Sequence, residues 1–274
     1  MIYKELNKGL RSIYKEYDVI VIDLWGVIHN GITLNDPAVE VLNELEIKKK
    51  EYYLISNAPR PKSSVSIFLK NLNLNKKFFS HIYTSGDAAL EALKSRKFGK
   101  KFFHIGPSRD FDLFNNFKND KVEDVKLANY FLCTGLFEKE DKNLGFYKDF
   151  FNNHNNIKLV CTNPDLIVHR GQKEEYCAGS VAKIFEEMGG DVIYYGKPYP
   201  EIYNNCIKDK KKVLAIGDNL NTDIKGANTM KYDSLFILNG VHRDHFSFNS
   251  SSNLNQLLKK FNLNINYFQF ELQW

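Results

Sequence analysis

The stretch VIVIDLWGVIHNG, from Val19 to Gly31, holds both the clearest strand signal of the chain and its most unusual residue. Four consecutive apolar residues, Val19 to Ile22, predict a parallel strand that is buried on both faces. Asp23 follows directly, and ligands in open α/β sheets bind at the carboxyl ends of the strands. Trp25 stands two residues after this carboxylate, where an indole offers no carboxyl group for acid or base chemistry.

Strand and helix patterns alternate along the rest of the chain. Further strands are predicted at 52–56, 82–84, 101–105, 128–133, 157–161, 192–195, 212–217, 233–238 and, in the aromatic tail, 268–274. Helices are predicted at 3–16, after Pro37, and at 61–72, 85–94, 109–116, 141–153, 176–188, 199–208 and 221–229. Such alternation implies a parallel sheet with right-handed crossovers. We therefore expect an α/β fold with a doubly wound, Rossmann-like sheet.

One connection is too long for a single crossover. The turns that follow the strands near 55 and 195 are about 140 residues apart, whereas ordinary connections are far shorter. We interpret the excess as an inserted α/β domain. The expected division is a core domain of residues 1–85 plus 189–274 and an inserted cap domain of residues 86–188.

Composition points to an ordinary globular protein. The 274 residues carry a formal net charge of +5, and the lysines are scattered rather than gathered in the basic stripe of a nucleic-acid binder. No apolar run reaches the roughly 18 residues of a membrane span. The cysteines form no C-x-x-C pair and read as buried thiols of a reducing compartment, which favours a cytoplasmic protein: Cys133, Cys161, Cys177 and Cys206.

Four predicted strand ends carry side chains suited to phosphate chemistry. They are Asp23, then Ser56, then Lys197 between a glycine and a proline, then Asp218 with Asp223. On adjacent parallel strands these groups would meet at one edge of the sheet. Clustered carboxylates repel one another, and a hard cation such as Mg²⁺, which prefers oxygen ligands, removes that repulsion. A lysine and a hydroxyl beside them suit a phosphoryl group.

These motifs, in this order, resemble those of the haloacid dehalogenase-like phosphatases. The matching segments are Asp23–Val27, Ser56, Gly196–Pro198 and Gly217–Asp223, with Trp25 as the one departure in the first. The chain resembles in particular the class with a large α/β cap inserted after the second motif, the p-nitrophenyl-phosphatase and sugar-phosphatase type. Thr162–Asp165 in the cap is also similar to this class.

The resemblance implies a role for each matching residue. Asp23 would attack the phosphorus and form an aspartyl-phosphate, while Ser56 and Lys197 would hold the phosphoryl oxygens. Mg²⁺ would be bound by Asp23, the backbone carbonyl of Trp25, Asp218 and Asp223. The substrate would be a small phosphorylated metabolite. We expect no nucleic-acid or membrane partner for the protein, and a homodimer is one option for its oligomeric state.

Four further residues are candidates for substrate binding, each with a plainer alternative. Asn57 lies in a turn after Ser56, and Arg60 is either a substrate anchor or a solvated charge. Asn163 and Asp165 either face the substrate from a cap loop or form an Asx-type turn. Arg170 is a weaker candidate of the same kind.

Trp25 raises the question of proton transfer. In the phosphatases that the chain resembles, an aspartate at this position protonates the leaving group and then activates water, a step worth about 10²–10⁴-fold in rate. We expect slow hydrolysis, a substrate with a good leaving group, or a replacement acid, for which His29 is the nearest candidate in sequence.

Two other functions compete with a phosphatase. A binding or regulatory protein could keep the metal and phosphate site without turnover, and Trp25 favours it. A dehalogenase is disfavoured because that chemistry needs no metal, which would leave Asp218 and Asp223 without a purpose. The pair His242 and His245 has metal-like spacing but no supporting ligands, so we interpret it as part of a loop.

Overall fold

The main sheet of the molecule is parallel throughout and has seven strands. The computed structural model describes residues 3–152, 154, 156–209, 211–246 and 250–274. The strand order is β1-β14-β13-β12-β2-β3-β4, which confirms the expected α/β fold. The strands are β1 (Lys4–Glu5), β2 (Val19–Asp23), β3 (Glu51–Ser56), β4 (Ile82–Thr84), β12 (Val213–Gly217), β13 (Asp233–Ile237) and β14 (Tyr267–Gln269).

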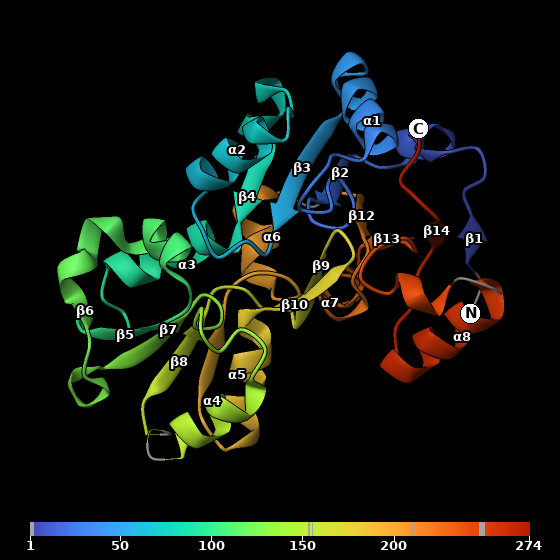
Figure 1. The fold of residues 1–274 in the computed structure, drawn as a ribbon. Coiled ribbons are helices and arrows are strands. Elements are labelled where there is room, and N and C mark those ends of the chain that lie inside the picture. Colours follow the sequence, from blue (N-terminus) through green and yellow to red (C-terminus); the bar gives the residue numbers. More distant parts are fainter. Residues whose placement is uncertain (1–2, 153, 155, 210, 247–249) are drawn as a thin grey trace.

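A second parallel sheet and a separate hairpin lie within the long connection between β4 and β12. The second sheet has the order β11-β8-β7-β5-β6. Its strands are β5 (Phe102–Ile105), β6 (Lys121–Val122), β7 (Tyr130–Cys133), β8 (Lys158–Cys161) and β11 (Val192–Tyr194). The antiparallel pair β9 (Ile167–Arg170) and β10 (Lys173–Tyr176), here called the hairpin, lies between the two sheets in Figure 1.

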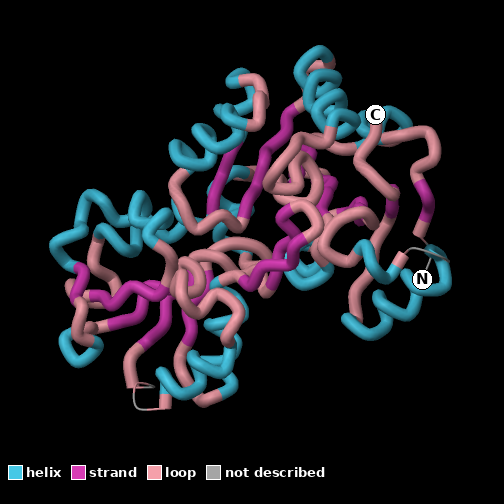
Figure 2. The backbone as a smooth tube through the Cα atoms, viewed as in Figure 1, coloured by secondary structure: helices cyan, strands magenta, loops and turns pink. Residues whose placement is uncertain are grey.

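Helices flank both sheets, as the tube in Figure 2 shows. They are α1 (Asp36–Ile47), α2 (Lys62–Asn71), α3 (Ser85–Lys94), α4 (Leu144–Phe151), α5 (Ala178–Glu187), α6 (Pro200–Cys206), α7 (Lys225–Met230) and α8 (Ser250–Phe261). The predicted helix at 109–116 is instead an irregular 3-10 segment, Ser108–Asp120. None of the described helices is long and apolar enough to cross a membrane. All four cysteines are free and buried, as expected.

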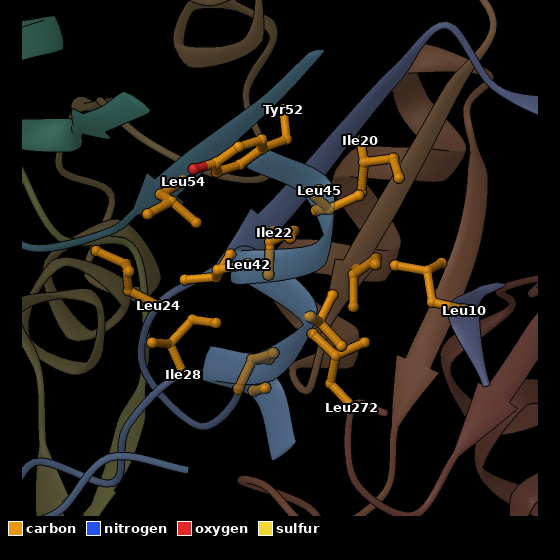
Figure 3. Packing of buried hydrophobic residues seen from close by; sticks show 14 of the residues in the cluster. Leu10, Ile20, Ile22, Leu24, Ile28, Leu42, Leu45, Tyr52, Leu54 and Leu272 are labelled. Carbon is orange, nitrogen blue, oxygen red and sulfur yellow. The ribbon is translucent and has the colours of Figure 1, made fainter. Parts of the chain in front are cut away.

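The hydrophobic core under the main sheet holds β2 rigidly. Ile20 and Ile22 of β2 pack with Leu54 of β3, and Leu42 and Leu45 of α1 close the cluster (Figure 3). Each of these side chains is fully buried. Burial of one such side chain is worth about 1.5–3 kcal/mol. The end of β2, and with it Asp23, is therefore held on a well-packed support.

The predicted helix at 3–16 is wrong. The segment forms β1 and two short 3-10 turns, Leu10–Ser12 and Tyr14–Glu16. Its backbone pairs with the C-terminal tail instead: Leu6 N–H donates to Phe268 and Leu10 N–H donates to Gln273. Hydrogen bonds to a distant segment thus outweigh the local helical spacing of the apolar residues. The tail forms a strand as predicted, but only over Tyr267–Gln269.

One strand lies in a different sheet from the one expected. The sequence pattern assigned 192–195 to the core domain, whereas β11 pairs with β8 in the second sheet. Main-chain hydrogen bonding to β8, which a strand pattern does not encode, decides this assignment. We propose that the inserted cap begins near residue 86 and that its second boundary lies after Tyr194 rather than at 188.

Candidate functional site

Three of the predicted site residues follow neighbouring strands of the main sheet. Asp23 ends β2, Ser56 ends β3, and Asp218 comes directly after β12. Because β2 pairs with both β3 and β12, the three side chains lie at one edge of the sheet. Each is less than 9% exposed. The strand-end argument made from the sequence therefore matches the topology for these residues.

The carboxylates of Asp23, Asp218 and Asp223 form a buried cluster. One oxygen from each lies within 4.8 Å of the others. Lys197 joins the cluster: its Nζ lies 2.5 Å from Asp23 Oδ1 and 2.7 Å from Asp223 Oδ1. One ammonium thus faces three carboxyl groups, so the cluster carries more potential negative than positive charge.

Burial and mutual repulsion shift the pKa values of this cluster. Burial raises the pKa of Asp23 well above its usual range; the Lys197 ammonium opposes this rise, and Asp223 and Asp218 add to it. Burial, followed by Asp223, raises the pKa of Asp218 to about 8. For Lys197, burial alone would lower the pKa, but Asp223 and Asp23 outweigh it and raise the pKa. The lysine therefore stays charged, while Asp23 and Asp218 tend to hold protons.

The donor set fits a hard divalent cation. Three buried carboxylates within reach of one point are the oxygen ligands that Mg²⁺ prefers, and a cation there would replace the protons of Asp23 and Asp218. Gly26, with φ +87°, lets the backbone approach the Asp218 carboxylate closely, because a Cβ at this position would overlap that carboxylate. Asp218 Oδ2 is oriented by the Val241 N–H at 2.7 Å. The carbonyl of Trp25 as a fourth ligand stays a prediction.

Lys197 reaches the cluster from outside the main sheet. It follows β11 of the second sheet, so the expectation that it ends a neighbouring core strand is wrong. Asn57 fixes its backbone: Lys197 N–H donates to Asn57 Oδ1 at 2.7 Å, and Asn57 Nδ2 donates to the Lys197 carbonyl at 3.1 Å. Gly196 has φ +113°, and a Cβ there would strike the Asn57 amide. Asn57, predicted as a substrate ligand, lies where it positions the lysine.

A cavity of about 600 Å³ opens from Asp23 toward the inserted segment. Ser56 lines it, and Ser56 Oγ accepts a hydrogen bond from the Ala58 N–H at 3.1 Å. Arg60 lines it as well, together with Arg109 and Asp110 from the other side, which the sequence analysis did not single out. Burial, opposed by Arg109, raises the pKa of Asp110 to about 6. The predicted nucleophile Asp23 and the predicted substrate ligand Arg60 thus line the same cavity.

The predicted cap loop reaches the carboxylate cluster. Asn163 Oδ1 accepts the Asp165 N–H at 3.1 Å, which is the Asx-type turn considered from the sequence. Asp165 Oδ1 accepts a hydrogen bond from Asn219 Nδ2 at 3.2 Å, and both Asn163 and Asp165 line the cavity. Burial, opposed by Lys197, raises the pKa of Asp165 to about 6. This loop therefore connects the inserted segment to the turn that carries Asp218 and Asp223.

Trp25 contacts the hairpin with both its polar and its apolar parts. Its indole N–H donates to the His169 carbonyl at 3.0 Å. The Arg170 guanidinium lies over its ring, 5.0 Å from the ring centroid, and also donates to the Gly31 carbonyl at 3.3 Å. Trp25 thus joins the first motif to the hairpin instead of offering a titratable group.

His29 is held neutral beside Trp25. Its Nδ1 accepts the Gly31 N–H at 3.0 Å, so the ring carries its proton on Nε2. Burial, with Arg170 in support, lowers the pKa of His29 to about 3. A neutral imidazole is a very weak acid, so the geometry disfavours His29 as the replacement acid.

A further arginine secures the hairpin turn. Arg243 Nη1 donates to the Gly171 carbonyl at 3.0 Å, and Arg243 Nη2 donates to Gln172 Oε1 at 3.2 Å. The adjacent His242 accepts the Leu220 N–H through Nε2 at 3.2 Å, which agrees with its interpretation as a loop residue. No sequence signal marked Arg243 for this contact, because it joins residues about 70 positions apart.

Two family profiles match this chain. One, described as haloacid dehalogenase-like hydrolase, matches residues 20–118, and one described as HAD-hydrolase-like matches residues 194–253. A solved structure of a haloacid dehalogenase-like family hydrolase from Brucella suis is similar, with a TM-score of 0.83 and 28% identity over 96% of this chain and 98% of that chain.

Curated relatives are more distant in sequence. A D-glycerol 3-phosphate phosphatase of Mycobacterium tuberculosis is 24% identical over 85% of this chain, a match that spans 66% of that protein. An acid sugar phosphatase of Staphylococcus aureus is 22% identical over 83% of this chain and 88% of that protein. Both are named for the hydrolysis of small phosphate esters.

Proposed function

We propose, because the chain belongs to the haloacid dehalogenase-like hydrolases, that it is a phosphatase of small phosphorylated metabolites. The observation that carries this proposal is the position of Lys197, whose ammonium bridges Asp23 and Asp223 beside Asp218 at the end of the main sheet. A nucleophilic carboxylate next to a fixed cation is the arrangement that phosphoryl transfer requires. Curated relatives named as phosphatases support it.

The reaction would proceed through Asp23. Its carboxylate would attack the phosphorus as the bond to the leaving oxygen breaks, which forms an aspartyl-phosphate, and water would then cleave this intermediate. Lys197 and Ser56 would bind the phosphoryl oxygens, and Asn57 would hold Lys197 in place. Mg²⁺, bound by Asp23, Asp218 and Asp223, would neutralise the charge that gathers on the transferred group.

The core domain, through Arg60, and the inserted segment, through Asn163 and Asp165, would supply the substrate contacts. Arg60, Asn163 and Asp165 line the cavity next to Asp23, where polar groups of a small metabolite would lie. The free buried cysteines suit a reducing compartment, and we propose that the protein works in the cytoplasm.

A panel of phosphomonoesters, each with and without Mg²⁺, tests the proposal. We expect metal-dependent release of phosphate that Asp23→Asn abolishes and Asp149→Asn, at an exposed carboxyl group of α4, leaves intact. Circular dichroism of both variants checks that they fold. Phosphate release that persists in Asp23→Asn would contradict the aspartyl-phosphate route.

A second candidate function is binding without turnover. The specific observation in its favour is Trp25, which offers no carboxyl group at this position and whose N–H already donates to the His169 carbonyl. Under this alternative, phosphate esters would bind in a Mg²⁺-dependent way, detectable by calorimetry, and no phosphate would be released from any of them.

A further inference from the structure

The wall of the cavity next to Asp23 is aromatic rather than acidic. Trp25, His29 and Phe68, here called the aromatic cluster, pack together: His29 lies edge-on to Trp25 at 5.0 Å and to Phe68 at 5.4 Å between ring centroids. All three line the cavity, as do the apolar side chains of Val65 and Val168. The leaving group of a phosphate ester bound next to Asp23 would contact aromatic and aliphatic side chains along this wall.

The aromatic cluster has no acidic proton to give. The one N–H of Trp25 is already donated to the His169 carbonyl, and Arg170 covers the ring. His29 is neutral, with Nδ1 occupied by the Gly31 N–H. Phe68 and the neighbouring valines are apolar. Among the described residues that form this wall, none can therefore protonate a departing oxygen.

Six other carboxyl groups of the described chain line the cavity, in different surroundings. Glu138, Asp141 and Glu174 are exposed, and Glu175 accepts hydrogen bonds from Lys173 Nζ at 3.0 Å and Arg170 Nε at 3.3 Å. Asp165 accepts from Asn219 and lies beside Lys197 and Asp223, on the phosphoryl side. Asp110 is buried in the inserted segment beside Thr134 and Arg109. Proton donation by any of them would weaken the dependence of the rate on the leaving group, which the experiment below measures.

We propose that Trp25 determines the substrate class: it directs the enzyme to phosphate esters with a flat leaving group that departs as a stable anion, such as aryl phosphates, and against alkyl phosphates. The P–O bond breaks as the Asp23–phosphorus bond forms, and the electron pair leaves on the oxygen, which takes its proton from water. A phenolate accepts that charge easily, whereas an alkoxide does not. This inference rests on the proposed phosphatase function.

Leaving-group dependence measures this directly. We expect the wild-type enzyme with Mg²⁺ to show kcat/KM for 4-nitrophenyl phosphate above that for glycerol 3-phosphate by about 10²–10⁴-fold, the usual worth of acid catalysis, with phenyl phosphate between them. Equal values for the three esters would overturn the inference and leave the phosphatase proposal standing. Failure to release phosphate from any ester would instead overturn the phosphatase proposal.

Three variants separate the effect of a missing proton donor from the effect of the aromatic contact. Trp25→Asp should narrow the ratio between the aryl and alkyl esters by raising the rate for glycerol 3-phosphate, and Trp25→Phe, the matched control that keeps a ring, should preserve it. Phe68→Ala should raise KM for the aryl esters about 3–10-fold through the lost ring contact and leave KM for glycerol 3-phosphate unchanged. A ratio that is the same in wild type and in a folded Trp25→Asp, checked by thermal unfolding, would count against the proposal.

Discussion

Two regions meet at Asp23, and they differ in chemistry and in the chain segments that build them. On one side, carboxylates and Lys197 make a buried ionic cluster at the ends of the main-sheet strands. On the other side lies Trp25, two residues after Asp23 in the sequence. It packs in the aromatic cluster and donates a hydrogen bond to the hairpin. The ionic side gathers carboxylates around an ammonium, while the aromatic side consists of two aromatic rings and the neutral imidazole of His29. The difference suggests that phosphate binding and leaving-group chemistry can vary independently on this fold.

Removal of Lys197 should give the largest effect, because it breaks the ionic side. Lys197→Met leaves buried carboxyl groups without their cation, which costs about 3–5 kcal/mol of unfolding free energy. It would also remove the proposed contact to the phosphoryl group, worth about 10²–10³-fold in kcat. Urea unfolding and phosphate release measure the two losses. Added Mg²⁺ should recover part of the stability, since it would bind the same carboxylates.

The same variant has a predicted pH dependence. Lys197 lowers the pKa values of Asp23 and Asp218, the latter about 8, so its removal raises them further. A carboxyl group whose folded pKa lies above its unfolded pKa binds more protons when folded, so stability falls as pH rises. Between pH 5 and 8 both proteins should therefore lose stability in parallel, and metal-free Lys197→Met should lose more than wild type only above about pH 8, where Asp218 of the wild type has released its proton. Lys208→Met, at an exposed lysine, is the control and should match wild type.

Asn57 tests how the ionic side is positioned. Asn57→Ala removes both hydrogen bonds to the Lys197 backbone, and two such bonds are worth about 1–3 kcal/mol together. We expect kcat to fall about 10–100-fold with little change in KM, because the lysine is displaced while the substrate contacts remain. A rise in KM at constant kcat would instead restore the sequence-based prediction that Asn57 binds substrate.

The two regions also differ in how far the sequence could reveal them. Asp23, Ser56 and Asp218 were predictable because an apolar run marks each strand and its end marks the polar residue. For Lys197, the motif was predictable but its place in the fold was not. The strand before it, β11, pairs with β8 of the second sheet rather than with the main sheet. The contact between Trp25 and the hairpin was not predictable. His169 is 144 residues away, and it takes part only through its backbone carbonyl, which any residue would offer. The helix expected at 3–16 failed for a similar reason, since its partner is the C-terminal tail.

Arg243 offers the mildest test, on the aromatic side. Arg243→Ala removes two hydrogen bonds to the hairpin turn, and partly exposed bonds of this kind contribute about 0.5–1.5 kcal/mol each. Trp25 and Arg170 would still hold the hairpin, so we expect KM to rise about 3–10-fold with kcat within a factor of about two. Arg11→Ala, at an exposed arginine near the N-terminus, is the matched control and should leave both constants unchanged. A loss of kcat as large as that of Asn57→Ala would mean that the hairpin positions the reacting groups themselves, and the two regions would then act as one.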